Sequence, residues 1–538
     1  MLQERTIRFE CSGKRPGLSR TLPGALRGPW ALRFALLGPA LALLLSARPG
    51  FPVTEKGSTA GPVAAENARQ GSKDWELSKP ATNREIEGYA SKVSVRPKET
   101  VELHVSTASK TFDIDIYRLG WYGGLGARKI SGTSGVAGGL RATPGPRQGD
   151  GLVECRWPVS YTVQVGSDWV SGVYLAKLTA SASGRQTFVP FVVLEKPGIP
   201  HPAAFLFQCA VTTWQAYNAW GGKSLYDFNS KGEARARRVS FNRPYGSGPG
   251  AWAGVGAGEL LTMAHTTRAG GWEYPMIRWL ERNGYDVAYA TNVDVASDPD
   301  VFTGRRAFLI VGHDEYWSRA MRTNVEAARD RGIHLGIFAA NVSYWQIRLE
   351  PSPYGGANRV MFCTKDAEQD SVYDTEADAD LTVRFRDLHP RRPENALVGM
   401  MISGEDVQTD FVPVPAQRSH WVFAGTGIAQ GTTTRLPGLG GYEVDRSYGD
   451  DSLYAKWSPP GLTVLARVPI VSSNGKKTVT ETTIYTAKSG AIVFATGTMQ
   501  WSWGLDDWGA PALHPACRHA DAERITKNVL EAFSRGGG

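Results

Sequence analysis

The fold is decided by one stretch of sequence: Ala307-Phe-Leu-Ile-Val311, then Gly312-His-Asp-Glu-Tyr-Trp317, then residues 318–331. The first segment has the length and apolar character of a buried parallel strand. The second segment reads as a loop. The third predicts a helix, because Ser318 is a favourable N-terminal cap and three apolar residues recur on one helical face: Met321, Val325 and Ala328.

A second strand is predicted directly after this helix, at residues 333–338. Gly332 ends the helix, and the strand runs on to Asn341. The whole stretch is therefore a strand–helix–strand unit. His313, Glu315 and Asn341 then lie just beyond the carboxyl ends of two parallel strands, which is where open α/β sheets bind their ligands.

Strands and helices alternate around this unit. We expect strands at residues 203–210 and 286–290, with a helix at residues 274–282 between them. Further strands and one closing amphipathic helix are predicted later in the chain: strands at 381–385, 421–423, 462–471, 477–486 and 491–495, and a helix at 520–534. This pattern predicts one α/β domain over residues 199–538, with a flavodoxin-like or glutamine-amidotransferase-like parallel sheet and a β-rich extension.

A β-rich segment precedes the α/β domain. Residues 100–105 and 112–117 alternate apolar and polar side chains, and further short strands are expected at residues 157–165, 172–178 and 187–194. The Pro-rich run Pro197-Gly-Ile-Pro-His-Pro202 marks the boundary between the two parts. We predict an immunoglobulin-like β-sandwich over residues 75–198, serving as a scaffold, a lid or a binding module.

The N-terminus is predicted to be a targeting segment. Residues 1–47 begin with a basic stretch and end in 14 uncharged residues, 34–47, which suit a signal peptide better than a membrane span. An uncleaved anchor is the alternative. Residues 48–74 are rich in Pro, Gly and Ala and are expected to be a linker. The protein is therefore expected to be exported: periplasmic, secreted or membrane-anchored.

Charge and cysteine content exclude two classes of partner. The net charge of the 538-residue chain is +8, but residues 1–47 hold seven Lys or Arg and two Glu, so they account for most of it. We therefore expect no nucleic-acid binding. Four cysteines lie beyond the targeting segment: Cys155, Cys209, Cys363 and Cys517. They show no Cys-x-x-Cys spacing, so metal binding by thiolates is not expected. The sequence leaves open whether two of them form a disulfide.

Several catalytic motifs are absent from the sequence. The His313-Asp-Glu315 run lacks the Pro-Cys-x-x-Cys partner of zinc deaminases. There is no His-Glu-x-x-His motif, no Gly-x-Ser-x-Gly elbow, and no cysteine in the loop after residue 311. The Gly222-Lys-Ser224 run lacks the first glycine of a phosphate-binding loop. Covalent Ser or Cys catalysis is therefore disfavoured.

Three further stretches could line a pocket or simply pack. Tyr217 and Tyr226 are nine residues apart and flank a Gly-Gly turn after the first strand of the α/β domain, but aromatic loop packing explains them as well. Glu443 lies in the Gly-rich run Gly438-Leu-Gly-Gly-Tyr-Glu443, which also reads as a surface loop. Trp501-Ser-Trp-Gly-Leu-Asp506-Asp507-Trp508 suits either a pocket rim or plain packing.

Four runs in the α/β region and two in the sandwich resemble one family. They are Trp214 to Tyr226, Gly312 to Ser318, Ala340-Asn341 and Met499-Gln-Trp-Ser-Trp-Gly504, together with Tyr117-Arg-Leu-Gly-Trp-Tyr-Gly-Gly124 and Asp168-Trp-Val-Ser-Gly172. They resemble the family of the N,N-dimethylformamidase large (β) subunit. The resemblance covers most of residues 75–535.

The resemblance implies a mononuclear iron centre. Its ligands would be Tyr217, Tyr226 and Glu315, with His313 and Asn341 as catalytic groups nearby and Glu443 as the proton carrier. Three anionic oxygens are hard ligands that prefer a hard ferric ion. Such an ion would lower the pKa of a tyrosine hydroxyl, polarise an amide carbonyl and activate water.

The sequence thus predicts an iron-dependent hydrolase that cleaves the C–N bond of a small linear amide. The alternative is a non-catalytic exported protein that binds a ligand or a carbohydrate and keeps the amidase fold. The expected partners are the amide substrate and either a second copy of the chain or a small accessory subunit. Contact with a membrane is expected only through an uncleaved N-terminal segment.

Overall fold

The computed structural model describes residues 61–246, 255–261, 271–451, 453–508 and 518–535. The predicted targeting segment and Cys517 lie outside these residues. Part of the predicted linker forms helix α1 (Pro62–Asn67). In the described part of the chain, no helix is both long and apolar enough to cross a membrane.

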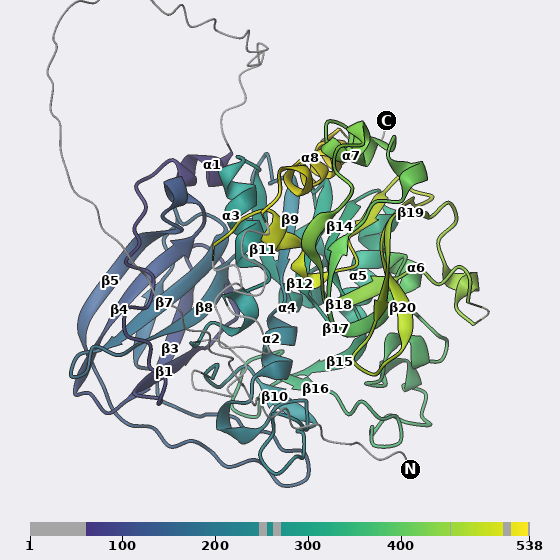
Figure 1. Cartoon of the computed structure of the whole chain (residues 1–538). Coiled ribbons are helices and arrows are strands. Elements are labelled where there is room, and N and C mark those ends of the chain that lie inside the picture. The colour runs from purple at the N-terminus through teal and green to yellow at the C-terminus, as the bar shows by residue number, and fades with distance from the viewer. Residues whose placement is uncertain (1–60, 247–254, 262–270, 452, 509–517, 536–538) are drawn as a thin grey trace, which may run out of the picture. The chain divides into compact units, whose positions relative to one another are not determined.

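The largest sheet has seven strands and is of mixed direction (Figure 1). Five neighbouring strands are parallel, and the sixth runs antiparallel to both of its neighbours. In spatial order they are β11 (Val287–Thr291), β9 (Phe205–Cys209), β12 (Ala307–His313), β14 (His334–Ala340), β21 (Ile492–Ala495), β20 (Lys477–Thr486) and β19 (Thr463–Val471). The chain is therefore mixed α/β, as predicted, and its C-terminal strands extend the same sheet.

The central strand–helix–strand unit is confirmed. All residues of β12 and β14 are buried, which explains their continuous apolar runs. Helix α5 (Arg319–Asp330) begins where predicted, because the Ser318 hydroxyl accepts a hydrogen bond from the Met321 N–H at 3.2 Å. The helix buries the three apolar residues of the predicted face.

Other helices lie between the strands of this sheet. Helix α3 (Tyr274–Arg282) has the predicted bounds, with a proline in its first turn. Short helices α2 (Val211–Tyr217) and α4 (Asn292–Ser297) follow β9 and β11 directly. Helix α8 (Ala520–Ser534) closes the chain as predicted. After β9 the chain moves to β11 on one side and then returns to β12 on the other, and such a reversal of strand order creates a crevice beyond the carboxyl ends of the strands.

Two predicted strands are wrong. Residues 381–385 form no strand. They make only an isolated antiparallel bridge, between Arg384 and Trp345 of β15 (Trp345–Glu350), and then run into a 3₁₀ turn (Phe385–Asp387), while the Thr382 N–H bonds to the Asp370 carboxylate. Residues 421–423 are also a 3₁₀ turn (Trp421–Phe423), held by the Asn528 side chain of α8, which donates to the Val422 carbonyl at 2.8 Å. Neither short apolar run extends into a strand of its own.

Two smaller sheets lie outside the predicted pattern. One has four strands, in the order β10 (Arg238–Ser240), β16 (Val360–Phe362), β15 (Trp345–Glu350) and β13 (Tyr316–Ser318). The other pairs β17 (Met401–Phe411) with β18 (Leu436–Arg446), and short helices α6 (Asn395–Val398) and α7 (Gly427–Gln430) lie nearby in the chain. The glycines of β18 have low strand propensity, so sequence reasoning assigned this run to a bend.

The β-rich N-terminal part forms two sheets. The first contains β1 (Ile86–Ala90), β3 (Thr100–Thr107) and β6 (Tyr161–Gln164). The second contains β2 (Ser94–Val95), β8 (Gln186–Val193), β7 (Gly172–Ala180), β4 (Thr111–Leu119) and β5 (Ala127–Ala137). Their inward side chains share one buried cluster, which includes the predicted face Phe112, Ile114 and Ile116. The predicted domain boundaries stay predictions.

A buried ion pair joins this β-rich part to the α/β part. Arg118 on β4 and Glu281 on α3 are both fully buried, and their atoms Nη2 and Oε1 lie 2.9 Å apart. Tyr289 on β11 donates a hydrogen bond to the same carboxylate at 2.7 Å, and the Ser171 carbonyl accepts from Arg118 at 2.8 Å. The pair is well satisfied, so removing either partner would leave a buried charge alone.

We predict that Arg118→Ala or Glu281→Ala lowers the free energy of unfolding by about 3–5 kcal/mol. Chemical denaturation followed by fluorescence would measure this. The matched control is Lys92→Ala, which breaks a pair with Glu99 in which both side chains are 47% exposed. That change should cost at most about 1 kcal/mol. Equal losses in the two pairs would contradict the assigned role of Arg118 and Glu281.

Candidate active site

Two tyrosines come together beyond the end of β9. Tyr217 is the last residue of α2, and the chain then turns through Gly221 and Gly222, whose φ angles are 74° and 85°. At Gly221 any side chain would also collide with Val153, since a Cβ would lie 2.6 Å from it. The turn brings Tyr226 back so that its ring stacks on that of Tyr217, with centroids 4.4 Å apart.

The hydroxyl groups of both tyrosines meet Glu315, which follows β12. The Tyr217 hydroxyl donates to Glu315 Oε2 at 2.9 Å, and the Tyr226 hydroxyl lies 2.8 Å from the same oxygen. The two phenol oxygens are 2.8 Å apart. Three oxygens from separate elements therefore form a nearly equilateral triangle beyond the carboxyl ends of β9 and β12.

His313 lies beside this triangle, at the end of β12. Its Nε2 atom is 3.4 Å from Glu315 Oε2 and 3.9 Å from Glu443 Oε2. Its other ring nitrogen, Nδ1, is 3.0 Å from Glu259 Oε2. His313 Nε2 is buried and makes no hydrogen bond to any of the described residues, so it has capacity for a group that enters the site.

Asn341 and Glu443 complete the site from the other side. Asn341 follows β14, and its Nδ2 donates to Glu443 Oε2 on β18 at 2.9 Å. Its backbone N–H donates to Asp445 Oδ1 at 3.0 Å, which holds Asn341 at a φ of 53°. Non-glycine residues at such angles cluster at functional sites. The side-chain oxygen of Asn341 is buried and has no hydrogen-bond partner within the described ranges.

A lysine that sequence reasoning missed covers the tyrosine pair. The Lys365 ammonium lies 3.3 Å from the ring centroid of Tyr226. It is 5.3 Å from the centroid of Tyr316 and 5.0 Å from that of Trp345, which are also within the range of cation–π contacts. Lys365 itself has a φ of 60°. Lys365 lies in the loop that runs from β16 to residue 382, and no sequence motif marks it.

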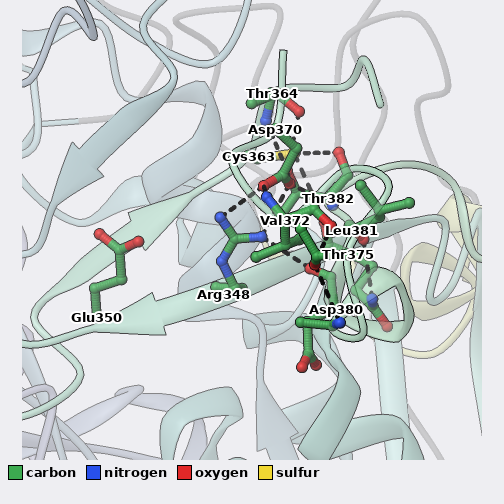
Figure 2. Close-up of polar contacts among 12 residues, drawn as sticks. Arg348, Glu350, Cys363, Thr364, Asp370, Val372, Thr375, Asp380, Leu381 and Thr382 are labelled. Atoms are coloured by element: carbon green, nitrogen blue, oxygen red, sulfur yellow. Dashed lines mark hydrogen bonds and ion pairs between the residues drawn. The ribbon is translucent and has the colours of Figure 1, made fainter. Parts of the chain in front are cut away.

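Figure 2 shows the polar network that holds this loop in place. Asp370 forms a two-pronged ion pair with Arg348 on β15, with distances of 2.9 Å and 2.8 Å. The same carboxylate accepts hydrogen bonds from the N–H and the hydroxyl of Thr382 at 2.9 Å and 2.6 Å. The Thr382 carbonyl in turn accepts from the Lys365 N–H at 3.0 Å. The network fixes the backbone from which Lys365 reaches Tyr226.

Burial and neighbouring charges shift the ionisation of the site. Burial alone would lower the pKa of His313, but Glu259, Glu315 and Glu443 outweigh it and raise that pKa well above its usual value. Burial raises the pKa of Glu443 to about 8, and Glu315 acts in the same direction. Burial lowers the pKa of Lys365 to about 8 in spite of Glu315. Proton carriers near neutral pH are typical of catalytic sites.

The oxygen triangle has the dimensions that a metal would require. Oxygen ligands about 2.0–2.2 Å from a metal, at angles near 90°, lie about 2.8–3.1 Å from one another. The triangle edges of 2.8–2.9 Å agree with this spacing, which is also that of ordinary hydrogen bonds. Across the described residues no group of three or more His, Cys, Asp or Glu side chains is placed to hold a metal. The triangle is of another kind, because only Glu315 belongs to those residue types.

Two of the sequence-predicted candidates lie elsewhere. Asp506 forms an ion pair with Arg278 on α3 at 2.9 Å, and the ring of Trp503 stacks on Trp272 with centroids 5.0 Å apart. The Trp-rich run therefore packs against neighbouring elements, which is the second of its two interpretations. The three described cysteines outside the targeting segment are free and buried: Cys155, Cys209 and Cys363.

A family model described as N,N-dimethylformamidase beta subunit-like, C-terminal, matches residues 113–517. The chain belongs to this family. No curated protein matches the chain. The span that matches the dimethylformamidase-like family contains all six predicted site residues, namely Tyr217, Tyr226, His313, Glu315, Asn341 and Glu443, which the structure brings together in one buried site.

Sequence reasoning missed three residues of this dimethylformamidase-like site. Glu259, Lys365 and Asp445 contact His313, Tyr226 and Asn341 respectively. Asp445 is two residues from Glu443, so the alternation of a strand could have indicated it. Glu259 lies in a short 3₁₀ turn (Gly258–Leu260) and Lys365 in an irregular loop, where sequence spacing carries no information about contacts.

We predict that Glu443→Gln stabilises the metal-free protein increasingly as pH rises. An unfolded glutamate loses its proton near pH 4.3, whereas Glu443 in the folded protein loses it near pH 8. Between these values the folded state holds an extra proton, so the free energy of unfolding of the wild type falls as pH rises through this range. Glutamine removes that loss.

Thermal unfolding of both proteins at about pH 5 and about pH 8.5 would measure the effect. The difference in midpoint temperature, variant minus wild type, should be larger at the higher pH. A difference that stays constant or shrinks would mean that Glu443 ionises at an ordinary pH.

Proposed function

We propose that this protein is an iron-dependent hydrolase that cleaves the C–N bond of a small linear amide. The observation that carries the proposal is the buried triangle of two phenol oxygens and one carboxylate oxygen, from Tyr217, Tyr226 and Glu315. Family membership supports the reaction class. Tyr217 and Glu315 are almost completely buried, so three potentially anionic oxygens would repel one another without a cation between them.

The donor set fits a ferric ion better than the softer metals. Phenolate and carboxylate oxygens are hard ligands, and no thiolate or imidazole belongs to the triangle. Burial and Glu315 raise the pKa of both tyrosine hydroxyls, so a strong positive charge is needed to hold them as phenolates. When bound, the ion would polarise the amide carbonyl and lower the pKa of a bound water.

The surrounding residues supply the remaining steps. We propose that the Asn341 amide donates to the carbonyl oxygen as negative charge develops on it. Glu443 accepts a proton from the attacking water and returns it later, which a carboxyl with a pKa of about 8 is suited to do. His313, whose Nε2 faces Glu315 and Glu443, orients the water or protonates the leaving amine.

The finer fold assignments also belong to this proposal. The parallel strands, numbered along the chain, lie in the order 2-1-3-4-5, which supports a flavodoxin-like sheet. The two sheets around a shared core support a sandwich of immunoglobulin-like type. We further propose an exported protein, on the basis of its N-terminal sequence, and an assembly with a second copy or a small accessory subunit, since the family name refers to a beta subunit.

We predict that the purified protein contains about one iron per chain and shows a visible charge-transfer band from phenolate to iron. Tyr217→Phe, Tyr226→Phe and Glu315→Ala should each lose most of the iron and the band. The matched control is Tyr316→Phe. Tyr316 packs edge-on against both tyrosines, with ring centroids 6.5 Å and 6.3 Å away, but lies outside the triangle. Its variant should keep both iron and colour.

Metal analysis and the visible spectrum would be recorded on the same samples. A colourless protein that takes up no iron would overturn the hydrolase proposal. It would favour the exported binding protein in its place.

We predict that Asn341→Ala lowers kcat for amide hydrolysis by about 10²–10³-fold, because a donor to the developing oxyanion is lost. Iron content and the charge-transfer band should not change, since Asn341 is not part of the oxygen triangle. Steady-state kinetics on a panel of small amides would measure the loss. A variant that loses iron together with activity would show that Asn341 supports the metal site instead.

A further inference from the structure

A buried carboxyl group to which the sequence analysis gave no role contacts His313 on the side away from Glu315. Glu259 Oε2 lies 3.0 Å from His313 Nδ1, and the Glu259 side chain is 1% exposed. Its second oxygen has no hydrogen-bond partner among the residues that the structure describes. Within the described part of the chain, the His313 imidazole is the only hydrogen-bond partner of the Glu259 carboxyl group.

Close backbone packing brings Glu259 to this position. The short described segment 255–261 contains Gly256 and Gly258, with φ angles of 79° and 61°. A side chain at Gly256 would meet the Phe188 carbonyl at 2.2 Å, and one at Gly258 would meet Trp214 on α2 at 3.1 Å. Glycine is therefore required at both positions.

The same segment is anchored to the sandwich. The Val255 carbonyl accepts a hydrogen bond from the Phe188 N–H on β8 at 3.2 Å and from the Thr187 hydroxyl at 3.4 Å. Only three residues separate this anchor from Glu259. The sandwich, in which sequence reasoning found no chemistry, thus holds one wall of the active site.

We propose that Glu259 is a positioning residue for His313. Its carboxylate accepts the Nδ1–H of the imidazole, which fixes the ring and directs Nε2 toward Glu315 and Glu443. Because β8 anchors the segment that carries Glu259, the sandwich takes part in building the site. The catalytic consequence rests on the proposed hydrolase function, whereas the hydrogen bond itself does not.

Another buried histidine of this protein shows the opposite arrangement. His334 Nδ1 accepts a hydrogen bond from the Ile492 N–H at 2.8 Å, so that nitrogen carries no proton. His313 faces an acceptor at the same atom and His334 faces a donor. The two rings therefore differ in which nitrogen must be protonated, and His334 is an internal reference.

Nuclear magnetic resonance of the metal-free protein labelled with ¹⁵N-histidine tests the hydrogen bond without any substrate. The wild type should show a protonated Nδ1 for His313, assigned by its absence in His313→Gln, and an unprotonated Nδ1 for His334. The Nδ1–H signal of His313 should be protected from solvent exchange and shifted downfield by its hydrogen bond in the wild type and in Glu259→Gln, whose side-chain oxygen still accepts, and should lose that downfield shift in Glu259→Leu. An unprotonated Nδ1 in the wild type would overturn the proposal, even if Glu259→Leu fails to fold.

Kinetics test the consequence for catalysis. Glu259→Leu should lower kcat by about 10–100-fold with little change in KM, iron content or visible band, and Glu259→Gln should recover most of the loss. In a His313→Ala background the same change should alter kcat by less than about twofold, because the two residues act as one unit. Additive losses in the double variant would overturn the positioning role.

The control is Glu273→Gln. Glu273 is another buried glutamate, which accepts from the Ala210 N–H at 2.8 Å. Its variant should leave kcat and the His313 signal unchanged, and a changed signal would count against a specific role of Glu259. If the wild type hydrolyses no amide, the proposed function fails while the resonance of His313 still decides the hydrogen bond, so the two failures are distinguishable.

Discussion

The structure depends on one electrostatic constraint, the burial of several acidic groups in a small volume beyond the carboxyl ends of the parallel strands. Glu259, Glu315 and Glu443 lie within one shell around His313, and two tyrosine hydroxyls share the Glu315 carboxylate. Buried carboxylates are stable only when cations or hydrogen-bond donors compensate them. His313 and Lys365 supply part of this charge, and the proposed iron would supply the rest.

This constraint explains why distant parts of the chain converge. Two oxygens of the triangle come from α2 and the loop that follows it, and the third comes from the residue pair after β12. Glu443 comes from β18, Lys365 from the loop after β16, and Glu259 from a segment bound to β8. Each of these supports is itself tied by buried polar contacts, such as the Asp370–Arg348 pair under Lys365 and the Arg118–Glu281 pair between β4 and α3. Buried pairs of this kind are poor sources of net stability but strongly penalise any arrangement that separates them.

Part of the site could be predicted from sequence, namely the residues whose positions follow from the order of strands and helices along the chain. Glu315, His313 and Asn341 follow buried parallel strands, and the position beyond such strands is dictated by the topology of α/β sheets. Tyr217, Tyr226 and Glu443 were chosen through family resemblance, because their local sequences also fit ordinary packing. Glu259 and Lys365 could not be predicted, since one lies in a short 3₁₀ turn and the other in an irregular loop, and the paths of these segments depend on contacts with β8 and with Asp370. Two short apolar runs were wrongly predicted as strands for the same reason.

The sequence by itself determined the strand–helix–strand unit, the alternation of the sandwich strands and the closing helix, because hydrophobic period, capping and glycine placement act over a few residues. Only the tertiary structure decided that Tyr226 folds back onto Tyr217, that the Gly-rich run carrying Glu443 is a largely buried strand, and that β8 of the N-terminal β-rich part contacts the segment that carries Glu259. These features arise from packing between segments far apart in the chain. A local pattern of side chains does not encode which distant surface it will meet.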